Sequence, residues 1–112
     1  MSNRLEVLPG TLELLVLSTV ATMGPLHGYG IARRIEQLGG EGLLLNEGTV
    51  YAALIRLQQE GAISADWGVS ENGRKARFYS ITKQGNKRLT TATRDWDRTV
   101  SMVARILNAE AK

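Results

Sequence analysis

Apolar residues recur with a helical period in the first half of the chain and with a strand period near its middle. Residues 11–23, 28–38 and 47–60 carry apolar side chains three and four positions apart, which predicts three helices. From residue 63 to residue 69 every second side chain is apolar, and residues 77–82 repeat the alternation, which predicts two strands. We therefore expect three helices followed by an antiparallel β-hairpin.

Each predicted element has an apolar face that we expect to be buried. Leu14 and Leu17 broaden that of the first helix, so we expect this helix to have two packing partners, its own core and another subunit. The expected core positions are Leu12, Leu15, Val16 and Val20 in the first helix, Ile31, Ile35 and Leu38 in the second, Val50, Leu54 and Leu57 in the third, and Ile63, Ala65, Trp67, Val69, Tyr79 and Ile81 in the hairpin. A chain of 112 residues with 43% apolar content fits one domain built on such a core.

Residues at the ends of these elements support the same boundaries. Asn46 is a suitable N-cap for the third helix because its side chain can accept a free backbone N–H, and Glu47 suits the positive end of a helix. Gly61 can end that helix. Asn72-Gly73 is a strong turn signal within the expected hairpin tip, and Thr82 is expected to cap a long final helix.

The final helix, expected over residues 83–109, carries an apolar seam with a repeat of about seven residues: Leu89, Trp96, Val100, Val103 and Leu107. Such a repeat on a long helix is typical of pairing with a second helix, so we expect a homodimer. The alternative is a stripe that only covers its own domain. In a dimer, two Trp96 rings would meet across the symmetry axis, as a packing anchor or as a site for a flat hydrophobic ligand.

Composition excludes several classes of protein. The chain has no cysteine, which excludes disulfides, thiolate catalysis and cysteine-based zinc sites and fits a reducing cytoplasm. The apolar run at residues 11–23 contains Glu13 and is too short to cross a bilayer, so we expect no membrane partner. His27, the one histidine, is expected to be structural, and Asp95 and Asp97 point to different faces of a helix. With no phosphate-binding loop or nucleophile motif, we expect no enzyme, metal or cofactor.

The net charge of +3 is unevenly distributed. Seven basic residues lie between Asn72 and Arg94 with no acidic residue among them: Arg74, Lys75, Arg77, Lys83, Lys87, Arg88 and Arg94. A concentrated positive stretch suits a polyphosphate partner such as double-stranded DNA. The alternative is a solvated surface.

The order helix, short helix, short helix, hairpin is that of a winged helix-turn-helix, in which the second short helix enters the major groove of DNA. We therefore divide the chain into residues 1–82, a DNA-binding domain with an N-terminal helix at 11–23, and residues 83–112, a dimerisation helix. Sequence specificity is expected from Glu47 and Thr49.

The DNA-binding residues are expected to begin at Asn46. Phosphate contacts are expected from the backbone N–H groups of Gly48 and Thr49, from the Tyr51 hydroxyl and from Arg56. The wing tip, Asn72-Gly73-Arg74-Lys75, is expected to reach a phosphate or the minor groove. Each of these has an ordinary alternative: Tyr51 as a core residue, Glu47 as a helix-start charge, and Arg74 and Lys75 as solvated turn residues.

Four short motifs follow one another along the chain: Leu8-Pro9-Gly10-Thr11-Leu12; His27-Gly28-Tyr29-Gly30-Ile31; Gly48-Thr49-Val50-Tyr51 with Leu54, Arg56, Leu57 and Gly61; and Ser70-Glu71-Asn72-Gly73-Arg74 with Tyr79, Thr82 and Gly85. Together they resemble the PadR family of bacterial transcriptional regulators, from Leu8 to about Leu107. The sequence departs from the family at Ala52, where many members have proline, and at Ser80, where a basic residue is common.

The resemblance implies a homodimeric winged-helix repressor that binds palindromic operators and is released by phenolic or other hydrophobic effectors. It places Gly48, Thr49 and Tyr51 on the recognition helix and residues 72–75 in the wing. One C-terminal helix is typical of the short branch, in which some members bind flat compounds with a tryptophan at the position of Trp96. The alternative function is a winged-helix module for protein–protein contact.

Overall fold

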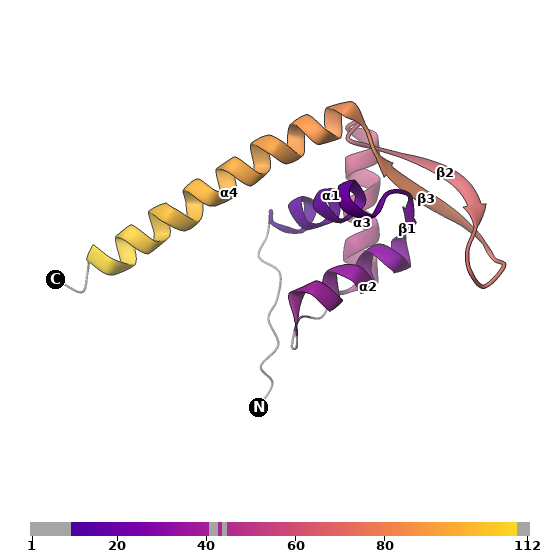
Figure 1. Ribbon diagram of the computed structural model, residues 1–112, viewed down its shortest axis with the longest axis horizontal. Coiled ribbons are helices and arrows are strands. Elements are labelled where there is room, and N and C mark those ends of the chain that lie inside the picture. The colour runs from indigo at the N-terminus through magenta and orange to yellow at the C-terminus, as the bar shows by residue number, and fades with distance from the viewer. Residues whose placement is uncertain (1–9, 41–42, 44, 110–112) are drawn as a thin grey trace.

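The computed structural model describes residues 10–40, 43 and 45–109, so the Leu8-Pro9 part of the first motif lies outside the described residues. The chain forms four helices and a three-stranded antiparallel sheet in the predicted winged-helix order (Figure 1). The elements are α1 (Leu12–Met23), β1 (Leu26–His27), α2 (Gly28–Gly39), α3 (Glu47–Gln59), β2 (Ile63–Val69), β3 (Lys75–Ile81) and α4 (Lys83–Ala109).

The sheet differs from the predicted hairpin in two respects. The strand order is β1-β3-β2, and β1 was not predicted, because it has only two residues and its pairing with β3 is not local in sequence. The return strand begins at Lys75 rather than at residue 77. The turn is shorter than expected because Ser70 N–H donates to the Arg74 carbonyl (2.8 Å) and Gly73 takes the left-handed conformation, with φ of +74°.

Residues from α1, α2, α3 and the base of the sheet form the core, and the predicted inward residues of α3 are all buried there. The prediction was wrong for Leu38, which is 68% exposed. Leu43 fills the core next to α2 instead, because the chain reverses at Gly40, with φ of +84°, and returns toward the helix. The Glu36 carboxylate accepts a hydrogen bond from the Leu45 N–H (2.9 Å), which ties the chain after α2 back to the helix.

The hairpin extends beyond the core, so its outer half is exposed. On one face of the sheet, Ile63 and Tyr79 are each 2% exposed. Farther along the same face, Trp67 is 62% exposed and Val69 is 70% exposed, so the prediction that both face the core was wrong. The hairpin projects beyond the helices, which leaves its outer half as a wing (Figure 1).

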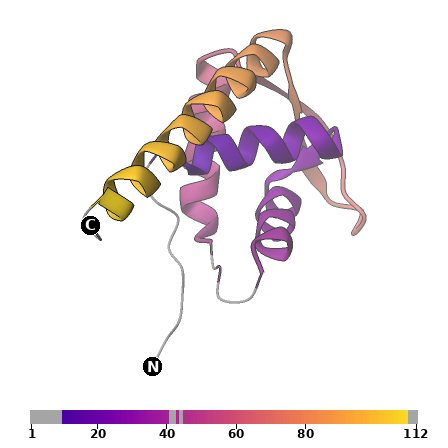
Figure 2. The ribbon, with the colours of Figure 1, turned by 60° about the vertical axis from the view of Figure 1, so that its left-hand side comes forward.

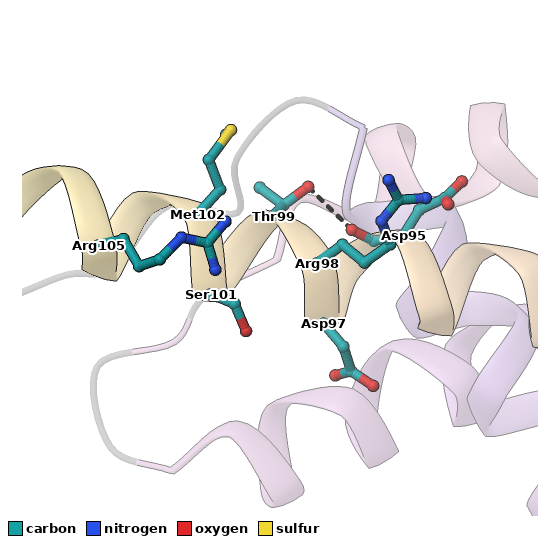
Figure 3. A pocket seen from close by; sticks show the side chains of 7 residues that line it. All are labelled: Asp95, Asp97, Arg98, Thr99, Ser101, Met102 and Arg105. Carbon is teal, nitrogen blue, oxygen red and sulfur yellow. Dashed lines mark hydrogen bonds between the residues drawn. The ribbon is translucent and has the colours of Figure 1, made fainter.

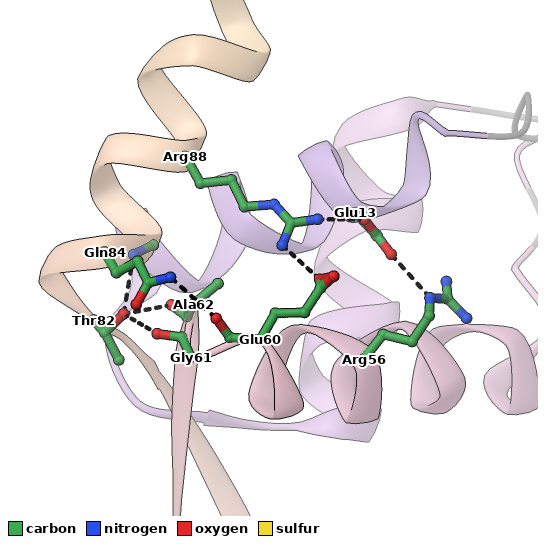
Figure 4. Close-up of polar contacts among 9 residues, drawn as sticks. Glu13, Arg56, Glu60, Gly61, Ala62, Thr82, Gln84 and Arg88 are labelled. Carbon is green, nitrogen blue, oxygen red and sulfur yellow. Dashed lines mark hydrogen bonds and ion pairs between the residues drawn. The ribbon is translucent and has the colours of Figure 1, made fainter.

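The start of α4 is attached closely to the body. Thr82 caps the helix as predicted, with Oγ1 accepting the Gly85 N–H (3.0 Å). The same hydroxyl lies 2.7 Å and 2.9 Å from the carbonyl oxygens of Gly61 and Ala62, which join α3 to β2 (Figure 4). Gly85 is buried against this loop, where a Cβ would overlap the Ala62 carbonyl oxygen. These contacts set the direction in which α4 leaves the domain.

The second half of α4 runs away from the other described elements, as two views of the ribbon show (Figures 1 and 2). Leu89, predicted to belong to the dimer seam, is half-buried against the core of its own domain. Farther along, the seam is exposed: Trp96 by 40%, Val100 by 47% and Leu107 by 65%. A shallow hollow beside it is lined by side chains of α4 only, which project to different sides of the helix (Figure 3). Within the described part of the chain, no helix has the length and apolarity needed to cross a membrane.

Candidate nucleic-acid interface

The N-terminus of α3 is capped by its own sequence. Asn46 Oδ1 accepts the N–H groups of Gly48 (2.8 Å) and Thr49 (3.3 Å), which confirms Asn46 as the N-cap. Because these two N–H groups are already occupied, the prediction that they bind phosphate does not fit this conformation. The positive end of the helix still faces outward, since residues 46–49 are exposed.

The polar side of α3 is accessible. Thr49 and Glu47 are exposed and Tyr51 is 50% exposed, so Tyr51 is not a core residue. Behind it, burial raises the pKa of the Tyr79 phenol above its ordinary value, and the nearby Tyr51 raises it further, while the charge of Arg77 acts in the opposite direction. The Tyr79 phenol therefore keeps its proton to higher pH than a free tyrosine, and it is buried next to the exposed Tyr51 of α3.

A groove of about 740 Å³ separates the start of α3 from the wing. It brings together predicted site residues from both parts of the chain, along with aromatic and charged residues that were not predicted to belong to the site. The predicted members are Glu47, Gly48, Tyr51, Asn72, Arg74 and Lys75; the additional ones include His27, Tyr29, Trp67, Glu71, Arg77 and Tyr79.

His27 has the structural role that the sequence suggested. Its Nδ1 accepts the Gly30 N–H (3.0 Å) and so caps α2. Its ring also contacts Phe78 edge-on, with centroids 5.6 Å apart, and stacks near Tyr29. The described residues contain no group of three or more histidine, cysteine, aspartate or glutamate side chains that could hold a metal ion.

The wing carries three cations at the groove. Arg77 lies opposite Trp67 in the strand register, and Lys75 lies opposite Val69. Lys75 Nζ is 4.9 Å and the Arg77 guanidinium carbon 5.6 Å from the Trp67 ring centroid. Trp67 and Arg77 were missing from the predicted site, although a hairpin centred on Asn72 places them opposite each other.

The basic residues between Asn72 and Arg94 do not form one continuous surface in the structure. Those on the wing face the groove, whereas Arg88 on α4 is bound to carboxylates of the body. Arg88 Nη1 lies 2.6 Å from Glu60 and Nη2 lies 2.8 Å from Glu13 (Figure 4). The hydrogen bond to Glu60 is the main cause of the raised pKa of Arg88.

Arg56 belongs to the same ion cluster. Its Nε donates to Glu13 (2.9 Å), so one carboxylate on α1 joins α3 to α4 (Figure 4). The side chain was predicted to contact DNA phosphate, but here it neutralises Glu13, and it does not line the groove. Exposed pairs of this kind add little stability, and their role is mainly geometric.

Two helices followed by a wing that flanks the second of them define the winged helix-turn-helix class. The chain belongs to the Transcriptional regulator PadR-like family, which it matches over residues 16–91. PadR-family regulators bind DNA and are typically dimeric. The protein is therefore a transcriptional regulator, not an enzyme.

Solved structures support this assignment. A transcriptional regulator from Clostridium thermocellum is similar with a TM-score of 0.77 and 27% identity, over 86% of this chain and 89% of that one. A PadR family transcription regulator from Clostridium difficile has a TM-score of 0.74 and 25% identity, over 88% and 99%. A protein of Lysinibacillus sphaericus is 27% identical over 93 residues, which cover 83% of this chain and 84% of its own.

Proposed function

We propose that the groove between α3 and the wing binds double-stranded DNA and that the protein is a sequence-specific transcriptional repressor. One observation carries the proposal: Tyr51 on α3 lines the groove together with three wing cations, Arg74, Lys75 and Arg77, and Thr49 is exposed on the same helix. Glu47 and Thr49 read base edges in the major groove, and the wing binds the backbone.

In this proposal α4 pairs two subunits. Its exposed apolar residues, Trp96, Val100, Val103 and Leu107, extend beyond the body and can be covered by the same helix of a second copy. The domain up to Thr82 then binds DNA, and the two-fold axis presents two α3 helices to a palindromic operator. Half-sites about 34 Å apart would place both helices on one side of the duplex. Binding there represses by blocking the promoter.

The test is selection of bound duplexes from a random library, followed by salt titration of the selected operator. We expect wild type to enrich an inverted repeat, and Thr49→Ala to alter or lose it. The double variant Arg74→Ala, Lys75→Ala should keep the motif but bind with a shallower salt dependence, because fewer counterions are released. Folded wild-type protein that binds no duplex even at low salt would refute the proposal and favour a protein-binding module.

We also propose a flat hydrophobic or phenolic effector at Trp96, which is 40% exposed among other apolar side chains of α4. In a dimer, two such rings would flank the axis and could stack on an aromatic compound. Quenching of tryptophan emission by flat aromatic compounds should persist in Trp67→Phe and disappear in Trp96→Ala. Quenching that survives Trp96→Ala would exclude this site.

A further inference from the structure

Trp67 occupies an unusual position on the wing. It lies on the sheet face that buries Ile63 and Tyr79 nearer the helices, but it is 62% exposed because the hairpin has left the core at this point. A single exposed apolar residue is ordinary on a protein surface. The neighbours of Trp67 set it apart, because the ring lines the groove together with two cations.

The indole ring holds both cations close. Lys75 Nζ lies 4.9 Å and the Arg77 guanidinium carbon 5.6 Å from its centroid, within the range of cation–π attraction. Tryptophan is the most favourable ring for this contact. The ion pairs found among the described residues include neither Lys75 nor Arg77, so no carboxylate contact neutralises either charge; Lys75 is exposed and Arg77 is half-buried.

We propose that Trp67 is a DNA-contacting residue that positions Lys75 and Arg77 against the phosphates and places its ring against the sugar of the same strand. This inference rests on the proposed function, which supplies the duplex in the groove. Lysine and arginine lose side-chain freedom when they bind phosphate, and cations already held on a ring lose less. Phosphate contacts carry no sequence information, so Trp67 determines affinity and leaves the choice of sequence to α3.

Intrinsic fluorescence gives a direct test because the chain contains only two tryptophans, Trp67 and Trp96. Wild type and Trp67→Phe are titrated with a random-sequence duplex at low salt, while anisotropy of labelled DNA reports binding independently. We expect wild-type emission to change and to saturate together with the anisotropy. In Trp67→Phe the DNA-dependent change should be absent, although binding persists.

Affinity gives the second readout. Trp67→Leu keeps an apolar side chain but removes the ring, and we expect about tenfold weaker binding to operator and random duplex alike. Trp67→Phe should recover most of this loss, since it retains an aromatic face. Unchanged emission during clear binding, or full affinity in Trp67→Leu, would overturn the proposal and leave the proposed function intact. No duplex binding by wild type would overturn both.

Discussion

Gly85→Ala tests how α4 is fixed to the body. Gly85 lies in the first turn of α4, and a Cβ there would overlap the carbonyl oxygen of Ala62 and lie 2.8 Å from Ile81 Cγ1. The first atom is backbone and the second belongs to the central strand, so relief requires α4 to move away from the base of the wing. The hydrogen bonds of Thr82 to this loop would then be strained.

Two effects of opposite sign set the magnitude. In an unobstructed helix, alanine in place of glycine stabilises by about 1 kcal/mol. Overpacking costs about 1–3 kcal/mol, and a clash with backbone belongs at the upper end of that range. The net expectation is a loss of about 2 kcal/mol, which lowers the melting temperature by roughly 10 °C in a domain of this size.

Thermal unfolding followed by circular dichroism measures this change, with all variants at one protein concentration because dimerisation makes the midpoint concentration-dependent. Gly28→Ala is the matched control, since its Cβ would lie 3.5 Å from Leu54 Cδ1, an ordinary contact. We expect the control to be as stable as wild type or up to about 1 kcal/mol more stable, because alanine favours the helix and meets no obstruction. A Gly85→Ala variant as stable as wild type, or more stable, would refute the close seating of α4.

Three further changes probe the core of the site and its supports. Asn46→Ala removes the cap of α3 and should cost about 1 kcal/mol in denaturant unfolding, whereas the exposed change Gln59→Ala should not. Burial raises the pKa of Tyr79, so as pH rises the unfolded chain loses the phenolic proton before the folded protein does. The free energy of unfolding should therefore fall as pH rises above about 10, and it should fall less steeply in Tyr79→Phe. Equal alkaline slopes would contradict the burial argument. Glu13→Gln breaks the ion pairs with Arg56 and Arg88 and should lower the free energy of unfolding by less than about 1 kcal/mol. The difference from wild type should shrink in high salt, because salt screens exposed charges. A difference that is the same in high salt would contradict an electrostatic origin.

Local signals were sufficient for much of the fold. The cap at Asn46, the alternation from Ile63 to Val69 and the turn at Asn72-Gly73 each act within a few residues, so their elements could be predicted closely. The bounds of α4 also matched the prediction because its start is set by Thr82.

Features that depend on distant pairing were not predictable in the same way. The strand β1 exists only because Leu26 and His27 meet Tyr79 and Phe78. A helical period cannot show that the chain returns after Gly40 and buries Leu43 in place of Leu38.

In the candidate site, too, features set by local sequence could be predicted and features set by distant contacts could not. That Thr49 and Tyr51 lie outside the buried stripe of α3 could be predicted from the helical period alone. The groove residue Trp67 was misplaced because alternation identifies a face of a strand but not the point where the core ends. The pairing of Glu13 with Arg88 joins residues 75 positions apart, and charge patterning along the sequence cannot reveal it.

The central claim is that the face formed by the start of α3 and the wing receives the duplex, and amide chemical shifts report this contact residue by residue. In a titration of isotope-labelled protein with its selected operator, the account predicts that the largest shifts gather at residues 46–51 and 67–77. The exposed second half of α4 should change little. Shifts concentrated on α4, with the start of α3 and the wing unaffected, would contradict the account.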